Sequence, residues 1–389
     1  MTEIYFDNSA TTRISPEALR VFCEVSEEHY GNPSSRHSRG ADAERLLDDA
    51  RGAVRGALGA TGGEVVFTAG GTEANNLAIL GRLRAKPRFM RGGKILTTAG
   101  EHASVSHPVE SLRSAGLTVA AIPTAGGVLD LDTLRREATP DVCLVSMMLV
   151  NNESGALYDL AAVAKIVHAA CPDAVFHVDA TQAFLKIPFT VKSLGCDLVT
   201  VSSHKIRGPK GVGALWISPA VIKNRGIAPV TLGGGQEGDL RSGTENVPGI
   251  AAFAAAVRDG LAAREETIAH LADLRAYLID RVQHTPALAE VRVNLPPVAA
   301  PHIVSLTMPR IKSETMLHYL SSKGIYVSSG SACSSHDAHL SSAMLAFGLS
   351  EREADTTVRV SFGVTNTREE VDTFLAALAD GVAHLIRTR

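Results

Sequence analysis

A single cysteine, Cys333, lies in the run SSGSACSS at residues 328–335, where all the other residues are small and most are polar. Such a run favours neither a packed core nor a helix. Because a thiolate is a strong nucleophile, a cysteine without a structural reason for its place suggests sulfur chemistry. A surface turn with an incidental cysteine is the other interpretation.

Asp179 and Lys205 follow two successive apolar, β-rich runs, in HVDATQ (177–182) and SSHKIRGPKGVG (202–213). A carboxylate at the end of a buried strand is costly unless a cation or hydrogen-bond donors compensate it. It could instead cap a helix. A desolvated lysine can form a Schiff base because its pKa falls, although a lysine in a surface turn is a far commoner occurrence.

A third motif, TAGGTEANNLAIL at residues 68–80, ends a strand with two glycines and opens a helix at Thr72. Backbone N–H groups and the helix dipole make such a junction an anion site, although an ordinary turn has the same pattern. GPKGVG is no phosphate loop, since it lacks GxxxxGK[ST] and leads into a strand. A phosphate cradle, a Schiff-base lysine and a carboxylate for a pyridine nitrogen are together the parts of a pyridoxal 5'-phosphate (PLP) site.

These motifs must be positioned by a sheet, and residues 65 to 220 alternate β-rich and helical patterns. The alternation predicts an α/β fold with a mainly parallel sheet covered on both faces, whose ligands bind beyond the carboxyl ends of the strands. We expect seven strands, at 64–67, 94–98, 117–122, 142–148, 174–179, 198–202 and 212–217. Helical patterns lie between most of them, for example at 73–84, 103–115, 130–138 and 159–170.

The rest of the chain predicts a second, smaller α+β domain. Residues 221–245 are rich in glycine and indicate a long functional loop, and 247–284 are helical and rich in alanine. A mixed strand and helix pattern follows, ending in a helix that starts with a capping box at Thr367. We expect a large cofactor domain at 15–250, and a small domain, carrying the cysteine loop, from 1–14 plus 251–389.

The bulk composition excludes several function classes. A net charge of −3 over 389 residues gives no electrostatic reason to expect nucleic acid or a membrane surface as a partner. No secretory signal or membrane-spanning run is apparent, and five scattered cysteines without a CxxC pair argue against disulfides. A reducing cytoplasm fits best. The other four cysteines have the pattern of structural residues: Cys23, Cys143, Cys171 and Cys196.

Over nearly its whole length the chain resembles the cysteine desulfurases of the class-V aminotransferase group, which are fold-type-I PLP enzymes. SSGSACSS, combined with the other motifs, is similar to the desulfurases that have a longer, mobile cysteine loop. The remaining matching segments are DNSATT (7–12), GNPSSRH (31–37), GGTEANNLAI (70–79), EHASV (101–105), VNNESG (150–155), HVDATQ (177–182), SSHKIRGPKG (202–211), RSGTEN (241–246) and VRVSFG (358–363).

Carried over position by position, the resemblance implies a role for each matching residue around the PLP ring. Lys205 would bond the cofactor aldehyde, and Asp179 would keep the pyridine nitrogen protonated. Gln182 would donate to the phenolic oxygen. His102 would stack on the ring and move protons, although without the resemblance a helix cap is the better interpretation. Asn152 would orient the cofactor oxygen and the substrate carboxylate, although it could also form a turn.

The resemblance extends to the phosphate, the substrate and a second subunit. Arg359 resembles the arginine that binds the substrate carboxylate, although it could be a strand-edge charge. Thr244 resembles a residue that reaches the phosphate of the other subunit, which implies a homodimer. The phosphate would be held by Gly71, Thr72, Ser202 and His204. The segments lining the family's substrate entrance are matched by Asn8, Ala10, Thr11 and Asn32.

The reaction implied by the resemblance converts L-cysteine to L-alanine. Lys205 or His102 would remove the Cα proton, and the Cys333 thiolate would attack the substrate sulfur and become a persulfide. A protein acceptor, either a scaffold or a thiol carrier, would then take the outer sulfur. Iron–sulfur cluster assembly and tRNA or cofactor thiolation are both compatible with this chemistry.

Some features depart from the family pattern or leave alternatives open. His336 and His339 follow Cys333 and could tune its pKa or bind a metal with it; because a fourth ligand is not evident, we expect a polar loop and no dedicated metal site. The chain ends at Arg389, soon after the last helix, whereas desulfurases that dock an iron–sulfur scaffold often have a longer tail. A selenocysteine lyase, another class-V lyase or transaminase, and a non-catalytic sulfur-relay partner are the competing hypotheses.

Overall fold

The computed structural model describes residues 3–329 and 340–385. Cys333, His336 and His339 therefore lie outside the described residues.

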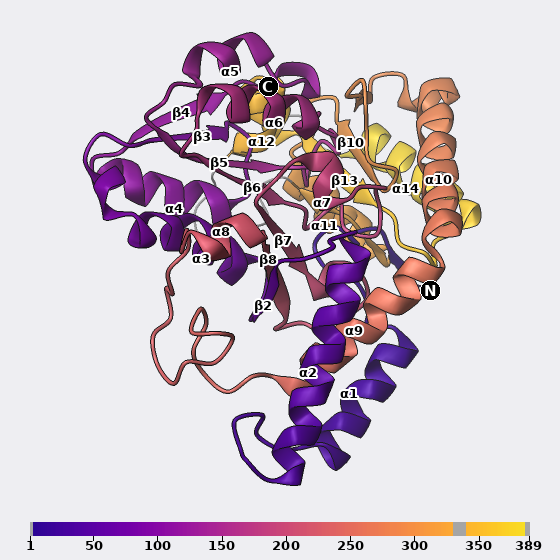
Figure 1. The fold of residues 1–389 in the computed structure, drawn as a ribbon. Coiled ribbons are helices and arrows are strands. Elements are labelled where there is room, and N and C mark those ends of the chain that lie inside the picture. The colour runs from indigo at the N-terminus through magenta and orange to yellow at the C-terminus, as the bar shows by residue number, and fades with distance from the viewer. Residues whose placement is uncertain (1–2, 330–339, 386–389) are drawn as a thin grey trace.

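A seven-stranded sheet forms the centre of the molecule, with strand order β2-β8-β7-β6-β5-β3-β4 (Figure 1). All neighbours pair in parallel except β8, which is antiparallel to both β2 and β7. The prediction of a mainly parallel sheet is confirmed. The strands are β2 (Glu64–Thr68), β3 (Lys94–Thr98), β4 (Thr118–Ile122), β5 (Val142–Met148), β6 (Val175–Asp179), β7 (Leu198–Ser202) and β8 (Gly213–Ile217).

Helices cover both faces of this sheet, because side chains alternate between the faces along each strand. On β2, Val65 and Phe67 belong to one apolar cluster and Val66 to another. The first face packs against α1 (Pro16–Glu28), α2 (Ser38–Ala57), α6 (Leu160–Ala170) and α9 (Val247–Ala262). The other packs against α3 (Gly71–Ala85) and α4 (Ala103–Ser114). Shorter helices are α5 (Leu131–Glu137), α7 (Val191–Leu194) and α8 (Pro219–Lys223).

A separate apolar cluster lies in the C-terminal half and includes Ile4 and Phe6 from the N-terminal segment. Phe6 is fully buried and packs edge-on against Phe362 and Phe374, with ring centroids 5.3 Å and 5.8 Å away. The first residues of the chain are thus built into its last part. The predicted domain boundary at residue 250 stays a prediction.

Two small sheets carry this second cluster. An antiparallel sheet has the order β12-β13-β10-β9, and β1 (Ile4–Tyr5) pairs in parallel with β11 (Ile325–Tyr326). The antiparallel strands are β9 (Arg292–Asn294), β10 (Ile303–Thr307), β12 (Ser328–Ser329) and β13 (Thr357–Ser361). The helices are α10 (Arg264–His284), α11 (Ser313–Ser322), α12 (Ser342–Phe347), α13 (Glu351–Asp355) and α14 (Arg368–His384). Short 3-10 helices elsewhere are η1 (Pro87–Met90), η2 (Ala125–Gly127), η3 (Ser203–Lys205) and η4 (Pro286–Leu288).

The predicted capping box of the last helix is confirmed. The Thr367 side chain accepts from the Glu370 N–H, and the Glu370 carboxylate accepts from the Thr367 N–H. This reciprocal pair satisfies two backbone donors at the helix start and fixes where α14 begins.

The predicted glycine-rich loop begins later than expected, because α8 includes residues 221–223. From α8 to α9 the chain then runs without a helix or strand and projects from the body of the molecule (Figure 1). Glu237 anchors it: its buried carboxylate accepts from both terminal nitrogens of Arg51, at 2.5 Å and 3.0 Å, and from the Phe67 N–H at 2.9 Å. A two-point contact between a guanidinium and a carboxylate both stabilises the loop and fixes its position.

Lys186 provides a test of this fold through pH. The side chain is 9% exposed and its Nζ has no hydrogen-bond partner among the described residues. Burial lowers its pKa from 10.5 to about 7, with a smaller effect from the nearby positive charge of Lys205. Between these two pH values the unfolded chain carries a proton that the folded chain lacks, so Lys186 makes stability rise with pH across this window.

We therefore expect wild-type protein to gain more stability between pH 7 and pH 10 than Lys186→Met does, by roughly 2 to 4 kcal/mol. Denaturant unfolding at fixed protein concentration measures both curves. Lys192→Met, at an exposed position on α7, is the matched control and should follow the wild type. Parallel curves for wild type and Lys186→Met would show that Lys186 stays charged in the fold.

Candidate active site

A cavity of about 450 Å³ opens at the carboxyl ends of three neighbouring parallel strands. Its wall includes Met148, Asp179 and Ser202, the last residues of β5, β6 and β7. The sequence predicted a ligand site at this edge. Eleven of the predicted site residues line the cavity: Ala10, Gly71, Thr72, His102, Asn152, Asp179, Gln182, Ser202, His204, Lys205 and Arg359.

Asp179 is compensated by hydrogen bonds. One carboxylate oxygen accepts from the Thr181 N–H at 2.9 Å, and the other accepts from the Asn75 side chain at 2.8 Å. No helix begins at Asp179, so the alternative of a helix cap is wrong. Asn75 also donates to the Ser104 hydroxyl at 2.8 Å, which connects the carboxylate to the segment that carries His102. These hydrogen bonds fix the orientation of the Asp179 carboxylate at the edge of the cavity.

Lys205, in η3 directly after β7, is held by the N-terminal segment. Its Nζ donates to the carbonyls of Ser9 at 2.5 Å and of Ala10 at 2.7 Å. The same Ser9 carbonyl accepts from the Gln182 amide at 2.9 Å. Among the described residues, the Ser9 carbonyl thus has two donors, Lys205 and Gln182. When a ligand binds the Lys205 amine, this carbonyl keeps only the Gln182 amide of these two.

One end of the cavity is suited to a phosphate. The first N–H groups of α3 have no partner within the helix, and Gly70, which precedes it with φ of 152°, has no side chain to cap them. The Ser202 hydroxyl is buried here without a partner among the described residues. His204 lines the same end of the cavity. Its pKa is lowered to about 4, mainly by burial and to a smaller extent by the charges of Lys205 and Lys210, so the ring is neutral.

His102 has the helix-capping role that the sequence left open, and it also lines the cavity. Its Nδ1 accepts from the Ser104 N–H at 3.1 Å, at the start of α4. Burial is the main cause that lowers its pKa. Because Nδ1 is an acceptor, the neutral ring carries its proton on Nε2. His102 can donate a hydrogen bond from Nε2 but is poorly placed to accept a proton.

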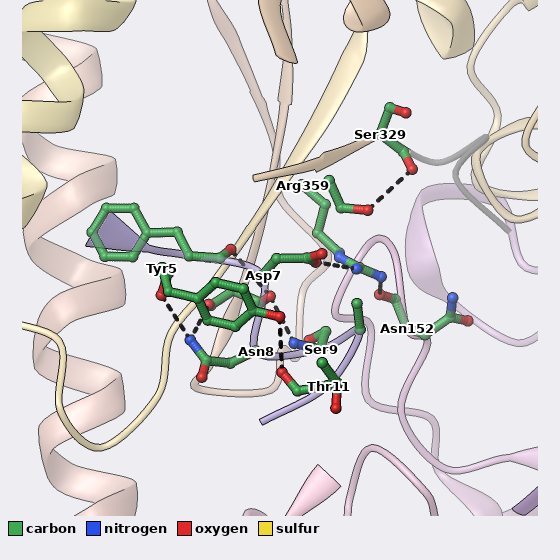
Figure 2. Close-up of polar contacts among 12 residues, drawn as sticks. Tyr5, Asp7, Asn8, Ser9, Thr11, Asn152, Ser329 and Arg359 are labelled. Atoms are coloured by element: carbon green, nitrogen blue, oxygen red, sulfur yellow. Dashed lines mark hydrogen bonds and ion pairs between the residues drawn. The ribbon is translucent and has the colours of Figure 1, made fainter. Parts of the chain in front are cut away.

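Arg359, on β13, lines the same cavity as Lys205 and is bonded on two sides. One terminal nitrogen donates to the Asn152 carbonyl at 2.8 Å and the other to the Asp7 carboxylate at 2.8 Å. Figure 2 shows the guanidinium between these two partners. Its Nε and the Asn152 Oδ1 are buried without a partner among the described residues. Two unsatisfied polar atoms at one wall indicate the place of a polar ligand group.

Several predicted residues do not line this cavity. The Asn8 amide points into backbone and donates to the carbonyls of Tyr5 and Ser361. Thr11 contacts His204 on the phosphate side, and Asn32 is exposed and accepts from its own turn. Thr244 is exposed on the anchored loop. Cys333 lies outside the described residues, but β12, which ends four residues before it, lines the cavity with Ser328 and Ser329.

Sequence reasoning missed several residues of the wall. Asn75 follows Gly71 by four residues and so lies one helical turn further along the same face, which was a detectable signal. Glu153 belongs to the segment VNNESG but was given no role, yet its carboxyl accepts from Ser341 at the start of α12, and burial raises its pKa. Asp7 and Ser9 act through an ion pair and a backbone carbonyl, for which the sequence has no signal.

The part of the chain that the structure describes has neither a membrane-spanning helix nor a cluster of metal ligands. None of its helices is long and apolar enough to cross a bilayer. Within the same residues, no three His, Cys, Asp or Glu side chains are grouped as a metal site, and the alternative of Cys333 with His336 and His339 lies outside them.

Comparison with known proteins agrees with this geometry. The family pattern described as "Aminotransferase class-V" matches residues 4–374. "Cysteine desulfurase IscS 1" of Archaeoglobus fulgidus is 37% identical over 99% of this chain and 98% of its own length. A solved structure described as "NIFS-LIKE PROTEIN" has a TM-score of 0.90 and 34% identity, covering 99% of this chain and 100% of its own.

A second solved structure, described as "SspA in complex with cysteine", has a TM-score of 0.79 and 30% identity, and covers 93% of this chain and 99% of its own. The family pattern, the curated relative and the NifS-like structure each extend over most of the chain. The chain belongs to the class-V aminotransferase family, within its NifS-like cysteine desulfurases.

Proposed function

We propose that the chain uses PLP to convert L-cysteine to L-alanine and transfers the sulfur to Cys333 as a persulfide. The observation that supports this most is the convergence of Asp179, Lys205 and Arg359 on one cavity whose wall also includes Ser329. A relative of 30% identity is described in complex with cysteine.

The residues present fit PLP at both ends of the cavity. The helix start at Gly71 and the partnerless Ser202 hydroxyl suit its phosphate, and Asp179 suits its pyridine nitrogen. Gln182 suits the phenolic oxygen, and the Lys205 amine suits the aldehyde. Bound PLP would supply an electron sink for the electron pair released at the substrate Cα.

The protons of the reaction fall to two residues with different capacities. The Lys205 amine, once free of the Ser9 and Ala10 carbonyls, is a base that can remove the Cα proton. His102 is held with its proton on Nε2, so we assign it the role of a hydrogen-bond donor and ring contact. Arg359 and Asn152 would orient the substrate carboxylate, using the guanidinium Nε that lacks a partner among the described residues.

The sulfur step balances without an external oxidant. The Cys333 thiolate attacks the substrate sulfur, an S–S bond forms, and the Cβ–S bond breaks. The substrate Cβ is reduced to a methyl group by taking up a proton, while the two sulfurs are oxidised to a persulfide. Cys333 follows Ser329, which lies on the cavity wall, by four positions, and an extended chain covers that many steps in about 14 Å at most.

We further propose a homodimer and a protein thiol as the sulfur acceptor. Thr244 is exposed and lies on the loop that Glu237 anchors, which suits a contact with the phosphate of a second subunit. Both iron–sulfur cluster assembly and tRNA or cofactor thiolation would use such an acceptor.

Cys333→Ala should reduce the rate of sulfide release from L-cysteine by about a thousandfold or more, because the nucleophile is lost. The PLP absorbance of the purified variant should be unchanged. Cys23→Ala removes an exposed cysteine on α1 and is the control that should retain full activity. Sulfide production in the presence of dithiothreitol measures all three proteins. Undiminished release from Cys333→Ala would place the chain among lyases that need no cysteine.

Lys205 and His102 can be separated by the exchange of the Cα proton of L-alanine in deuterated water, which does not require Cys333. We expect Lys205→Ala to slow exchange by about 10² to 10⁴, the usual contribution of a positioned base. His102→Gln should slow it much less, because the histidine cannot readily accept a proton while Nδ1 caps α4. NMR of the alanine Cα signal follows the exchange. The reverse ranking of the two variants would make His102 the base.

A further inference from the structure

The Arg359 guanidinium already has a carboxylate partner from its own chain. The Arg359 side chain is 10% exposed and forms an ion pair with Asp7, with Nη2 and Oδ1 2.8 Å apart. The other terminal nitrogen is bonded to the Asn152 carbonyl. Only Nε is buried with no partner among the described residues. A substrate carboxylate therefore meets an arginine whose charge is already balanced.

Among the described residues, three carboxylates line the cavity, and Asp7 is the one that forms an ion pair with Arg359. Asp179 is bonded to Asn75 and Thr181, and Glu153 accepts from Ser341. Asp7 itself is 21% exposed at its side chain, so its carboxylate has room to turn toward water when Arg359 is taken.

The backbone around Asp7 has no such freedom. Asp7 forms a parallel bridge with Ser361, and the Ser361 N–H donates to the Phe6 carbonyl at 2.7 Å. The Asn8 N–H donates to the Ser361 carbonyl at 3.2 Å. Phe6 is fully buried. Because the main chain is fixed, Asp7 can release Arg359 only by rotation of its side chain, and it returns to the same place afterwards.

We propose that Asp7 is an internal competitor of the substrate: its carboxylate occupies Arg359 in the free enzyme and exchanges with the carboxylate of the amino acid. This inference rests on the proposed function. A substrate carboxylate that takes both Nε and Nη2 makes a two-point contact, whereas Asp7 makes a single one, so the exchange favours the substrate. When alanine has formed, Asp7 competes again and shortens the residence of the product.

Asp7→Asn in the PLP-loaded enzyme tests the exchange, because it removes the charge and retains the shape. We expect the Kd of L-alanine, measured by isothermal titration calorimetry, to fall about five- to twentyfold, since one partly screened negative charge beside the bound carboxylate is gone. The KM for L-cysteine should fall in parallel, and kcat should not rise. Inhibition of turnover by added L-alanine should become stronger.

The control is Asp132→Asn, which removes the same charge from an exposed position on α5 and should leave alanine binding unchanged. If Asp7→Asn does not fold, Asp7→Ser is measured in the same way. Weaker alanine binding would show that Asp7 orients Arg359 and does not compete, and unchanged binding would show that it has no effect; either result overturns the proposal. Failure of the proposed function gives a different result: wild-type enzyme would make no alanine from L-cysteine. The alanine titration reports the competition at Arg359 and does not depend on that turnover.

Discussion

The hydrogen bonds that join the segment Phe6–Ala10 to β13 and to Lys205 are the interaction on which the rest of the site depends. Ser361 holds this segment from one side through its backbone and hydroxyl groups. The segment also supplies the Asp7 carboxylate to Arg359 on the same strand, and the Ser9 carbonyl to Lys205 and Gln182. Together with the bond from Arg359 to the Asn152 carbonyl, it links the strand that carries Arg359 to the strand ends that carry Asp179 and Lys205.

Burial then determines which groups of the cavity carry charge. The pKa of His102 and of His204 is lowered chiefly by burial, so both rings are neutral and the strong positive charges are those of Lys205 and Arg359. Asp7 pairs with Arg359 at 2.8 Å, whereas Asp179 accepts from the neutral Asn75 amide at 2.8 Å.

Local sequence patterns were sufficient to predict the elements that position the site. The strand runs and the capping box at Thr367 are short-range signals, because apolar alternation and cap residues act within a few positions. The resemblance then indicated which residues to expect in the cavity, and eleven of them line it.

Long-range partners were beyond such signals. Asn75 meets Asp179 across 104 positions, and Asp7 meets Arg359 across 352. Asn8 was grouped with the substrate entrance by resemblance, yet its amide is used to hold the backbone of Tyr5 and Ser361. Contacts of this kind follow from the packing of Phe6 into a distant cluster, which no local pattern reports.

The central claim, that this cavity delivers sulfur from L-cysteine to Cys333, is tested most directly by peptide mass spectrometry after a single turnover. PLP-loaded enzyme is mixed with one equivalent of L-cysteine without reductant, and thiols are alkylated before digestion. The account predicts that the peptide containing Cys333 gains the mass of one sulfur atom, while those containing Cys23, Cys143, Cys171 and Cys196 do not. Alanine formation with no added sulfur on Cys333, or with sulfur on another cysteine, would contradict it.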